Sequence, residues 1–144
     1  MRKIMSDLIF IERVPTVEEY AALIASVGWK EREPEAIRLA LGNSLYAVCA
    51  RFENQLVGMG RVIGDGGLHY YLSDVVVLPN HQHKGIGTRI VNMLNHYLDT
   101  LPYRSTLVGI IAGKGTREFY ERCGYTAQNS HSPAMYRWVN REDA

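Results

Sequence analysis

The amino-acid sequence predicts a single α/β domain over residues 1–144, with a mixed, mostly antiparallel sheet flanked by about four helices. Three observations lead to this prediction. Apolar, β-branched runs recur between residues 45 and 78 with short turns between them, as in antiparallel strands. After residue 85 the apolar period becomes that of a helix. The chain has 144 residues, 47% of them hydrophobic, which suits one ordinary domain with one core.

The N-terminal part is expected to form a strand and two helices. An apolar run at residues 8–14 is typical of a strand. Thr16 and Glu19 then form a capping box, because each side chain can bind a free backbone N–H at the start of a helix. Pro34 suits the first turn of a second, short helix, and Gly42 is placed to end it.

The middle of the chain is expected to form a hairpin and a long central strand. Residues 45–52 and 56–63 are apolar runs separated by three polar residues, which predicts an antiparallel pair. A long strand follows at residues 68–78. Its three consecutive valines, Val75 to Val77, indicate that its second half is covered on both faces. Pro79 ends this strand, because proline cannot donate to a sheet ladder.

A helix and a further strand are expected next. Apolar side chains at helical spacing form one stripe over residues 85–101. A short apolar strand at residues 107–112 follows, so strand, helix and strand form a right-handed parallel crossover. A short helix is expected at residues 116–123, and two edge strands at about residues 125–128 and 134–139.

Charge and cysteine content argue against several classes of protein. The chain has 16 Lys and Arg against 15 Asp and Glu, and this net charge of +1 gives no reason to expect a nucleic-acid or membrane partner. Cys49 and Cys123 lie in apolar contexts without the spacing of zinc ligands, so no metal site is expected. No long apolar run suggests a signal peptide or a membrane span, so we expect a cytoplasmic protein.

Residues 82–88, Gln-His-Lys-Gly-Ile-Gly-Thr, carry the clearest chemical signal. Gly85 and Gly87 let the backbone bend tightly and approach a ligand closely. The first N–H groups of the following helix have no internal partners and lie at the positive end of its dipole, and Lys84 adds a full charge. These features predict a pyrophosphate site at the carboxyl end of a parallel strand. Without further context, such a segment can also be no more than a tight turn.

Together with two other segments, this one resembles the GCN5-related N-acetyltransferase (GNAT) family. The family motif Gln/Arg-x-x-Gly-x-Gly/Ala, which follows an apolar triplet, is similar to residues 75–87. Residues 119–125, Phe-Tyr-Glu-Arg-Cys-Gly-Tyr, resemble the family's Phe-Tyr-x-x-x-Gly-Phe/Tyr. Residues 56–61 are similar to the strand that the family places beside its central one. The three matches occur in the family's order and span most of residues 46–125.

The resemblance implies a GNAT-type fold with a central pair of splayed parallel strands, and acetyl-coenzyme A (acetyl-CoA) as cosubstrate with its pantetheine arm in the gap. It implies that Tyr120 is the general acid for the departing thiolate. Residues 112–115, Ala-Gly-Lys-Gly, stand where many relatives carry an Asn that contacts pantetheine, so Lys114 is a candidate phosphate partner instead. The residues expected to bind the cofactor are Val75, Val76, Val77, Gln82, His83, Lys84, Gly85, Ile86, Gly87 and Thr88.

The general base is less clear. Family members often use an acidic residue on the central strand, and here Asp74 follows the usual position, which holds Ser73. Strand alternation places His69, Tyr71 and Ser73 on one face and Asp74 on the other, unless a bulge changes the parity. Asp74 is therefore the catalytic candidate, although a structural, hydrogen-bonded carboxylate explains it as well.

The acceptor is expected to be a primary amine of a small molecule or peptide, in a pocket built by the first helices and the last strands. The candidate lining residues are Trp29, Tyr46, Tyr70, Tyr71 and residues 135–138. Arg61 is placed to meet an acidic group, although core packing explains most of the aromatic residues. Two other functions remain open: a non-catalytic acyl-CoA-binding sensor or regulatory module, and a general phosphate- or nucleotide-binding domain. Because homodimers are common in the family, a homodimer is expected.

Overall fold

The computed structural model describes residues 7–128, 131, 134–135 and 137–138. The chain divides into two compact units, Met1–Ile110 and Ile111–Ala144. The first unit contains a five-stranded sheet made of β1 (Leu8–Ile11), β2 (Tyr46–Phe52), β3 (Gln55–Gly64), β4 (His69–Val77) and β5 (Leu107–Gly109). Its helices are α1 (Val17–Ser26), α2 (Pro34–Gly42) and α3 (Ile86–Asp99), and the 3-10 turn η2 (Pro79–His81) lies between β4 and α3.

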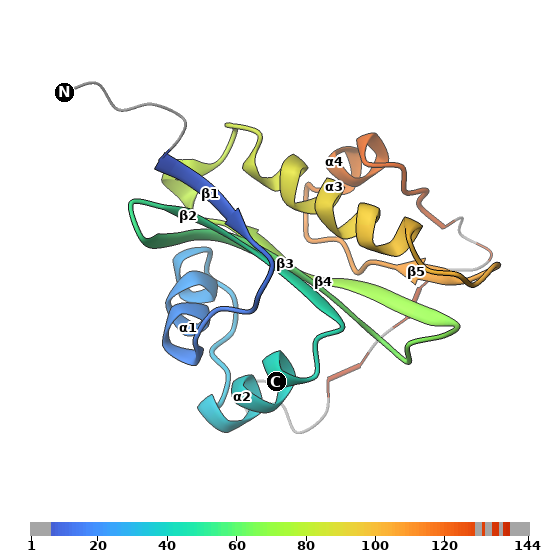
Figure 1. Ribbon diagram of the computed structural model, residues 1–144, viewed down its shortest axis with the longest axis horizontal. Helices are drawn as coiled ribbons and strands as arrows, with labels where there is room; N and C mark the ends of the chain where they lie inside the picture. Colours follow the sequence, from blue (N-terminus) through green and yellow to red (C-terminus); the bar gives the residue numbers. More distant parts are fainter. Residues whose placement is uncertain (1–6, 129–130, 132–133, 136, 139–144) are drawn as a thin grey trace. The chain divides into compact units, whose positions relative to one another are not determined.

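The strands lie in the order β1-β2-β3-β4-β5 (Figure 1). The pairs from β1 to β4 are antiparallel, and β5 is parallel to β4. This mixed sheet confirms the predicted fold class, including the parallel strands on either side of α3. The hairpin between β2 and β3 turns through only two residues, Glu53 and Asn54, whose φ angles of 51° and 66° suit the twist of the flanking strands.

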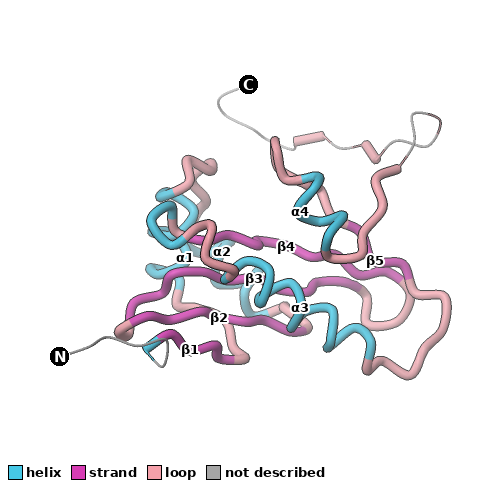
Figure 2. Tube along the Cα trace, turned by 90° about the horizontal axis from the view of Figure 1, so that it is seen from above, coloured by secondary structure: helices cyan, strands magenta, loops and turns pink. Residues whose placement is uncertain are grey.

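Helices cover both faces of the sheet. In Figure 1, α1 and α2 lie on one side of it and α3 on the other, and in Figure 2 α3 lies in front of the strands. Small residues let α3 approach β3 closely, since a Cβ on Gly60 would lie 2.7 Å from Ile90 Cγ2 and 3.1 Å from Leu94 Cδ1. On the other face, the buried core consists of Tyr20, Leu23, Ile24, Ile37, Leu41, Cys49, Leu56, Met59 and Val76.

The predicted capping box at the start of α1 is present. Glu19 N–H donates to Thr16 Oγ1 at 3.1 Å, and Thr16 N–H donates to Glu19 Oε1 at 3.0 Å. Glu19 has a second role, because Arg51 of β2 donates to both of its carboxylate oxygens, at 2.7 and 2.9 Å. The hydrogen bonds from Arg51 lower the Glu19 pKa to about 2. One carboxylate therefore caps α1 and fastens it to the sheet.

A β-bulge interrupts the pairing of β3 with β4. Met59 pairs with Val76, but Arg61 pairs with Ser73. Asp74 and Val75 therefore both lie opposite Gly60. Asp74 has a φ of +55°, in the left-handed region that aspartate tolerates better than most residues. The bulge changes which face of the sheet the successive side chains of β4 occupy. The candidate active site depends on this change.

The second unit contains α4 (Arg117–Arg122) as predicted, with Thr116 at its N-cap. The predicted edge strand at residues 125–128 is wrong, since these residues have no strand pairing. Of the predicted strand at residues 134–139, the four described residues have no strand assignment, and 136 and 139 lie outside the described residues. Within the described part of both units, no helix is long and apolar enough to cross a membrane.

Candidate active site

The segment between β4 and α3 presents backbone donors to solvent. Gly85 is the N-cap of α3 and has a φ of 82° and a ψ of 3°, so it adopts the left-handed conformation that glycine tolerates at little cost. No side chain among the described residues caps the helix, and its first backbone bond runs from Arg89 N–H to the Gly85 carbonyl at 3.1 Å. The N–H groups of Ile86, Gly87 and Thr88 are therefore those that helix geometry leaves without an internal partner.

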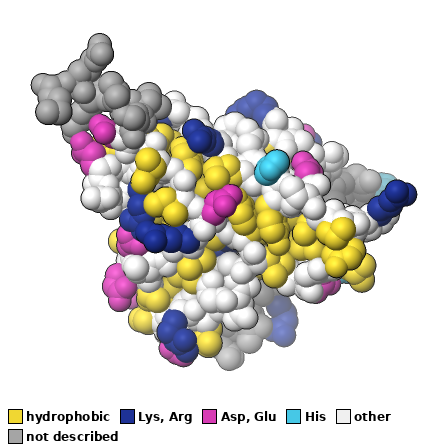
Figure 3. Space-filling model, viewed as in Figure 1, with side chains coloured by type: hydrophobic (Ala, Val, Ile, Leu, Met, Phe, Trp, Pro, Cys, Tyr) yellow, Lys and Arg dark blue, Asp and Glu magenta, His cyan; other side chains and the backbone are white. Residues whose placement is uncertain are grey.

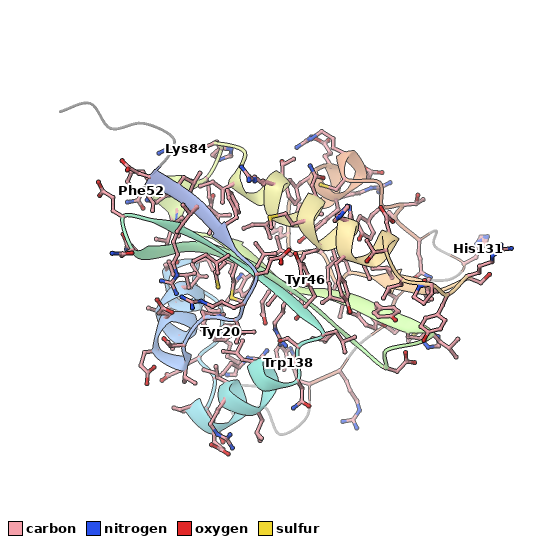
Figure 4. The ribbon with its side chains drawn as sticks, viewed as in Figure 1. Tyr20, Tyr46, Phe52, Lys84, His131 and Trp138 are labelled. Carbon is pink, nitrogen blue, oxygen red and sulfur yellow. The ribbon has the colours of Figure 1, made fainter. Side chains whose placement is uncertain are left out.

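Side chains of the same loop hold it in place. The Gln82 side-chain amide donates to the Val77 carbonyl at 3.0 Å, which fastens the loop to the end of β4. The His81 ring lies 5.7 Å from the Phe52 ring, at the hairpin between β2 and β3. Lys84 is exposed just before α3 (Figure 4). Gln82 thus holds the loop in position against β4. The exposed positive charge of the loop comes from Lys84.

The second half of β4 has an open edge. β5 pairs only with its first three residues, from His69 to Tyr71. Beyond them, β3 lies on one side of β4, and no strand among the described residues is hydrogen-bonded to the other side. The Val77 carbonyl faces this open edge, where Gln82 binds it. Because the N–H and C=O of one strand residue point the same way, the Val77 N–H faces the same edge. Such groups require a partner when they are covered.

On the α1 and α2 side of the sheet lies a pocket of about 140 Å³. It is lined by Tyr20, Arg32, Ala36, Ile37, Ala40, Leu41, Arg61, Ser73 and Asp74. Both Ser73 and Asp74 reach it, although simple alternation places them on opposite faces, because the bulge between β3 and β4 changes the parity. Regular alternation predicts that Asp74 and Ser73 lie on opposite faces of the sheet. The bulge corrects this prediction, because the two side chains lie on the same face.

The polar floor of the pocket is a hydrogen-bonded cluster around Asp74. Tyr20 donates to Asp74 Oδ1 at 2.9 Å, and Arg61 Nε donates to Asp74 Oδ2 at 2.7 Å. The two charged side chains are largely buried, with 10% of Arg61 and 13% of Asp74 exposed. Arg61 Nη1 also donates to the Ala40 carbonyl and to Ser44 Oγ, at 3.0 and 3.2 Å. Burial, followed by the negative charge of Asp74, raises the Tyr20 pKa, so its hydroxyl remains a donor.

Sequence reasoning did not identify the polar side chains of Tyr20 and Arg32 as part of this pocket. Tyr20 belongs to the buried face of α1, and only its hydroxyl signals a polar role. Arg61 does meet an acidic group, but this group belongs to the protein itself. Figure 4 shows Tyr20 between α1 and the sheet and Tyr46 farther along it, where Tyr46 stacks on Tyr97 with ring centroids 4.6 Å apart.

The other aromatic residues expected in the acceptor pocket do not line it. Tyr70 is buried, whereas Trp29 and Tyr71 are exposed. Residues 135–138 belong to the second unit, and of these residue 136 lies outside the described residues. The observed pocket is therefore built from α1, α2, β3 and β4, with a charged rather than an aromatic floor.

Tyr120 lies on α4 in the second unit, where the Phe119 and Tyr125 rings meet it edge-on at centroid distances of 5.0 and 6.4 Å. Burial, followed by the neighbouring Cys123, raises the Tyr120 pKa to about 12. Its phenol therefore stays protonated throughout the physiological range.

Metal-binding and charge patterns add little to the site. Among the described residues, no three His, Cys, Asp or Glu side chains gather as a metal site requires. On the face shown in Figure 3, Lys and Arg side chains are scattered among acidic and apolar ones. The candidate functional groups of the first unit therefore lie at two places. One is the open edge of β4 with the start of α3, and the other is the pocket around Asp74.

Comparison with known proteins identifies the family. The model of the acetyltransferase (GNAT) family matches residues 14–125. An uncharacterised N-acetyltransferase from Pyropia yezoensis is 27% identical over 127 residues, which are 85% of this chain and 71% of that protein. The solved structure of a probable acetyltransferase from meticillin-resistant Staphylococcus aureus is 30% identical, covers 92% of this chain and 99% of its own, and has a TM-score of 0.86.

A GNAT-family structure from Streptococcus pneumoniae has the same fold at 24% identity, with a TM-score of 0.76 and coverage of 94% of this chain and 99% of its own. The family match includes most of the chain, and the loop and the second unit's Phe-Tyr segment both fall within it. The chain therefore belongs to the GNAT family of acetyltransferases.

Proposed function

We propose that the protein transfers the acetyl group of acetyl-CoA directly to a primary amine of a small molecule or peptide. The GNAT family typically uses this acetyl donor. The observation that carries the proposal is the open edge of β4, which leads directly into the uncapped start of α3. An extended pantetheine arm needs backbone partners along its length and a pyrophosphate needs N–H donors, and here the two kinds of partner are adjacent.

The backbone from Val75 to Val77 would bind the pantetheine arm, and the loop from Gln82 to Thr88 would hold the pyrophosphate. These groups fit the cofactor because the α3 N–H groups have no side-chain cap and because Gly85 presents no side chain to a phosphate. Lys84 adds a positive charge beside them. Both chain units would belong to one acetyltransferase domain, in line with a family match that runs from residue 14 to 125.

Bound acetyl-CoA supplies a thioester: the new N–C bond forms as the C–S bond breaks, the amine loses one proton, and sulfur leaves as a thiolate. In our proposal the Val77 N–H donates to the negative charge that develops on the acyl oxygen. Tyr120 serves as the acid toward the thiolate. Because its pKa of about 12 exceeds the value of about 8.5 of a free thiol, it acts chiefly by donating a hydrogen bond.

Asp74 is the proposed acceptor of the amine proton, directly or through a water molecule. Each of its carboxylate oxygens already accepts one hydrogen bond, from Tyr20 or Arg61. A carboxylate has about four lone-pair sites, so each oxygen can accept another donor from the pocket. A cytoplasmic location and a homodimer remain predictions from the sequence and from the family resemblance.

Ligand-induced stabilisation tests the proposal. Acetyl-CoA at about one hundred times its dissociation constant should add about 2.7 kcal/mol of stability and raise the thermal midpoint by several degrees, whereas ATP and NAD should not. An acceptor screen then measures the release of CoA thiol, with Tyr120→Phe expected to lower kcat while leaving acetyl-CoA affinity unchanged.

The outcomes separate the rival functions. A shift with acetyl-CoA but no turnover of any amine would support a non-catalytic acyl-CoA sensor, an alternative motivated by the Ala-Gly-Lys-Gly sequence at residues 112–115 where many relatives carry Asn. Equal shifts with ATP would support a general nucleotide-binding domain. No shift in folded, cofactor-free protein would refute cofactor binding by the loop.

A further inference from the structure

Tyr20 is the neutral hydrogen-bonding partner of Asp74 in the floor of the pocket. Its side chain lines the pocket, and its hydroxyl donates to Asp74 Oδ1 at 2.9 Å. A carboxylate in an ion pair only accepts hydrogen bonds, so the Tyr20 proton points at Asp74 and the lone pairs of the phenol oxygen face away from it. A ligand N–H that reaches Tyr20 therefore meets an acceptor that is already connected to the carboxylate.

The first turn of α1 fixes the position of Tyr20. Glu19, its neighbour in the chain, completes the capping box with Thr16 and accepts two hydrogen bonds from Arg51 of β2. Tyr20 N–H donates to the Thr16 carbonyl at 2.9 Å, and only 8% of the Tyr20 residue is exposed. The hydroxyl is therefore held at its carboxylate partner before a substrate binds, as precise proton transfer requires.

Charge favours the Tyr20 side of the carboxylate for an attacking amine. The amine nitrogen gains positive charge as its bond to the acyl carbon forms. The Arg61 guanidinium, whose Nε binds Asp74 Oδ2 at 2.7 Å, repels such a charge near that oxygen. At Oδ1 the partner is the neutral Tyr20 hydroxyl, so the approach to this oxygen is the more favourable one.

The phenol of Tyr20 keeps its own proton until another arrives. Burial and the charge of Asp74 raise the Tyr20 pKa, and the opposing effects of Arg61 and Arg32 are smaller. A free phenolate is therefore disfavoured. Any proton that Tyr20 gives to Asp74 has to be replaced at the same time by one from a ligand.

We propose that Tyr20 is a catalytic residue that contacts the acceptor amine and relays its proton to Asp74. The inference rests on the proposed acetyl transfer and specifies the route by which the amine proton reaches the carboxylate. The distance suits this role, since proton transfer requires a hydrogen-bond reach of about 2.6–3.2 Å and the Tyr20 hydroxyl lies 2.9 Å from Asp74 Oδ1.

The relay moves two protons and leaves Tyr20 unchanged. As the amine nitrogen bonds to the acyl carbon, its N–H proton passes to the Tyr20 oxygen, while the proton that Tyr20 carried passes to Asp74 Oδ1. The electron pair of the breaking C–S bond leaves with the thiolate. Asp74 is then a neutral acid beside Arg61, and release of its proton to water restores the ion pair.

Tyr20→Phe tests the relay, and Tyr46→Phe is its matched control. Tyr46 also donates its hydroxyl to a carboxylate, to Glu12 Oε1 at 2.7 Å, but it lies outside the described lining of the pocket. Release of CoA thiol is measured with glycine, phenethylamine, spermidine and a short peptide with a free N-terminus as acceptors. The temperature is one at which circular dichroism shows both variants folded.

Tyr20→Phe should lower kcat about 10–100-fold, because general acid–base catalysis contributes about 10²–10⁴-fold and water replaces part of the lost group. Its KM for acetyl-CoA should stay within about two-fold, because the lost interaction belongs to the transition state. Tyr46→Phe should leave both kcat and KM within about two-fold of the unmodified protein.

Heavy water separates a relay from a merely structural role of Tyr20. Single-turnover rates of acetyl transfer are measured by rapid quench in mixtures of light and heavy water. Two protons that move together give a rate that curves with the deuterium fraction, whereas one proton gives a straight line. The unmodified protein should show the curve, and Tyr20→Phe the straight line. The first of these measurements needs no substitution, so it decides the question even if the variant does not fold.

Failure of this inference is distinguishable from failure of the acetyltransferase proposal. If acetyl-CoA stabilises the protein and amines are acetylated, but the unmodified protein gives a straight or flat dependence on deuterium, the relay is overturned. A loss of kcat in Tyr20→Phe of less than about five-fold, or no greater than in Tyr46→Phe, also overturns it. Stabilisation without turnover of any acceptor supports the acyl-CoA sensor and overturns the relay. Absence of both stabilisation and turnover overturns the proposed function itself.

Discussion

The ion pair of Asp74 and Arg61 provides a quantitative test of the structure. Asp74→Asn keeps a side-chain oxygen and a residue type that tolerates a positive φ, so it removes the charge without adding backbone strain. Arg61 would then stay 10% exposed without its carboxylate. Breaking a buried ion pair on one side costs about 3–5 kcal/mol, and the retained oxygen reduces this to about 2–4 kcal/mol. For a chain of this length, the thermal midpoint should fall by roughly 6–15 °C.

The assay is thermal unfolding followed by circular dichroism, with Tyr20→Phe measured beside Asp74→Asn. Tyr20 donates the other hydrogen bond to Asp74, and a hydrogen bond to a charged group contributes about 1.5–3 kcal/mol, somewhat below the cost of about 2–4 kcal/mol for Asp74→Asn. The charge-removing variant should therefore be the less stable of the two. A fall of less than about 2 °C for Asp74→Asn, or a larger one for Tyr20→Phe, would refute the conclusion that the ion pair dominates the floor of the pocket.

Three further predictions concern other parts of the structure. Gly85→Ala should cost about 1–2 kcal/mol in unfolding free energy and weaken acetyl-CoA binding, because its φ of 82° disfavours a side chain although space is available; Gly85→Asn should be milder. Gly60→Ala should cost about 1–3 kcal/mol by forcing α3 away from β3, whereas Gly42→Ala, with nothing within 4 Å, should not destabilise; equal melting temperatures would contradict this. The depressed Glu19 pKa gives stability that is present above pH 4.5 and lost as pH falls toward 2, at most about 3 kcal/mol; Arg51→Met should remove most of this acid dependence in melts from pH 6 to 2, and the hydrogen bonds with Thr16 should retain the rest.

Much of the first unit could be predicted from the sequence, because its signals are local. The capping box at Thr16, the turn after Phe52 and the stop at Pro79 each act within a few residues, and the structure confirms the elements that they delimit. The glycine-rich loop was equally readable, since the left-handed Gly85 needs no distant partner. The predicted strand at residues 125–128 failed because a strand exists only through pairing, which no local pattern supplies.

The candidate pocket could be predicted only in part. Asp74 and Arg61 were singled out, but their contact depends on a bulge that inserts one residue opposite Gly60, and such an insertion is defined by the partner strand rather than by β4 itself. Tyr20 lies 54 positions away from Asp74 along the chain, on the face of α1 that also buries Leu23 and Ile24. A buried hydroxyl needs a partner, but the sequence does not say which residue supplies it.

We also expect the open edge of β4 to affect solubility. An unpaired strand edge is a template on which another chain can add a strand, and proteins usually guard such edges with charge, proline or a covering element. Here the unpaired stretch of backbone includes three consecutive valines, of which Val76 and Val77 have buried side chains, and Pro79 follows shortly after its end. A ligand lying along this edge would act as a substitute strand, so its occupancy would also protect the protein from self-association. Loss of ligand would then appear as aggregation before it appears as unfolding.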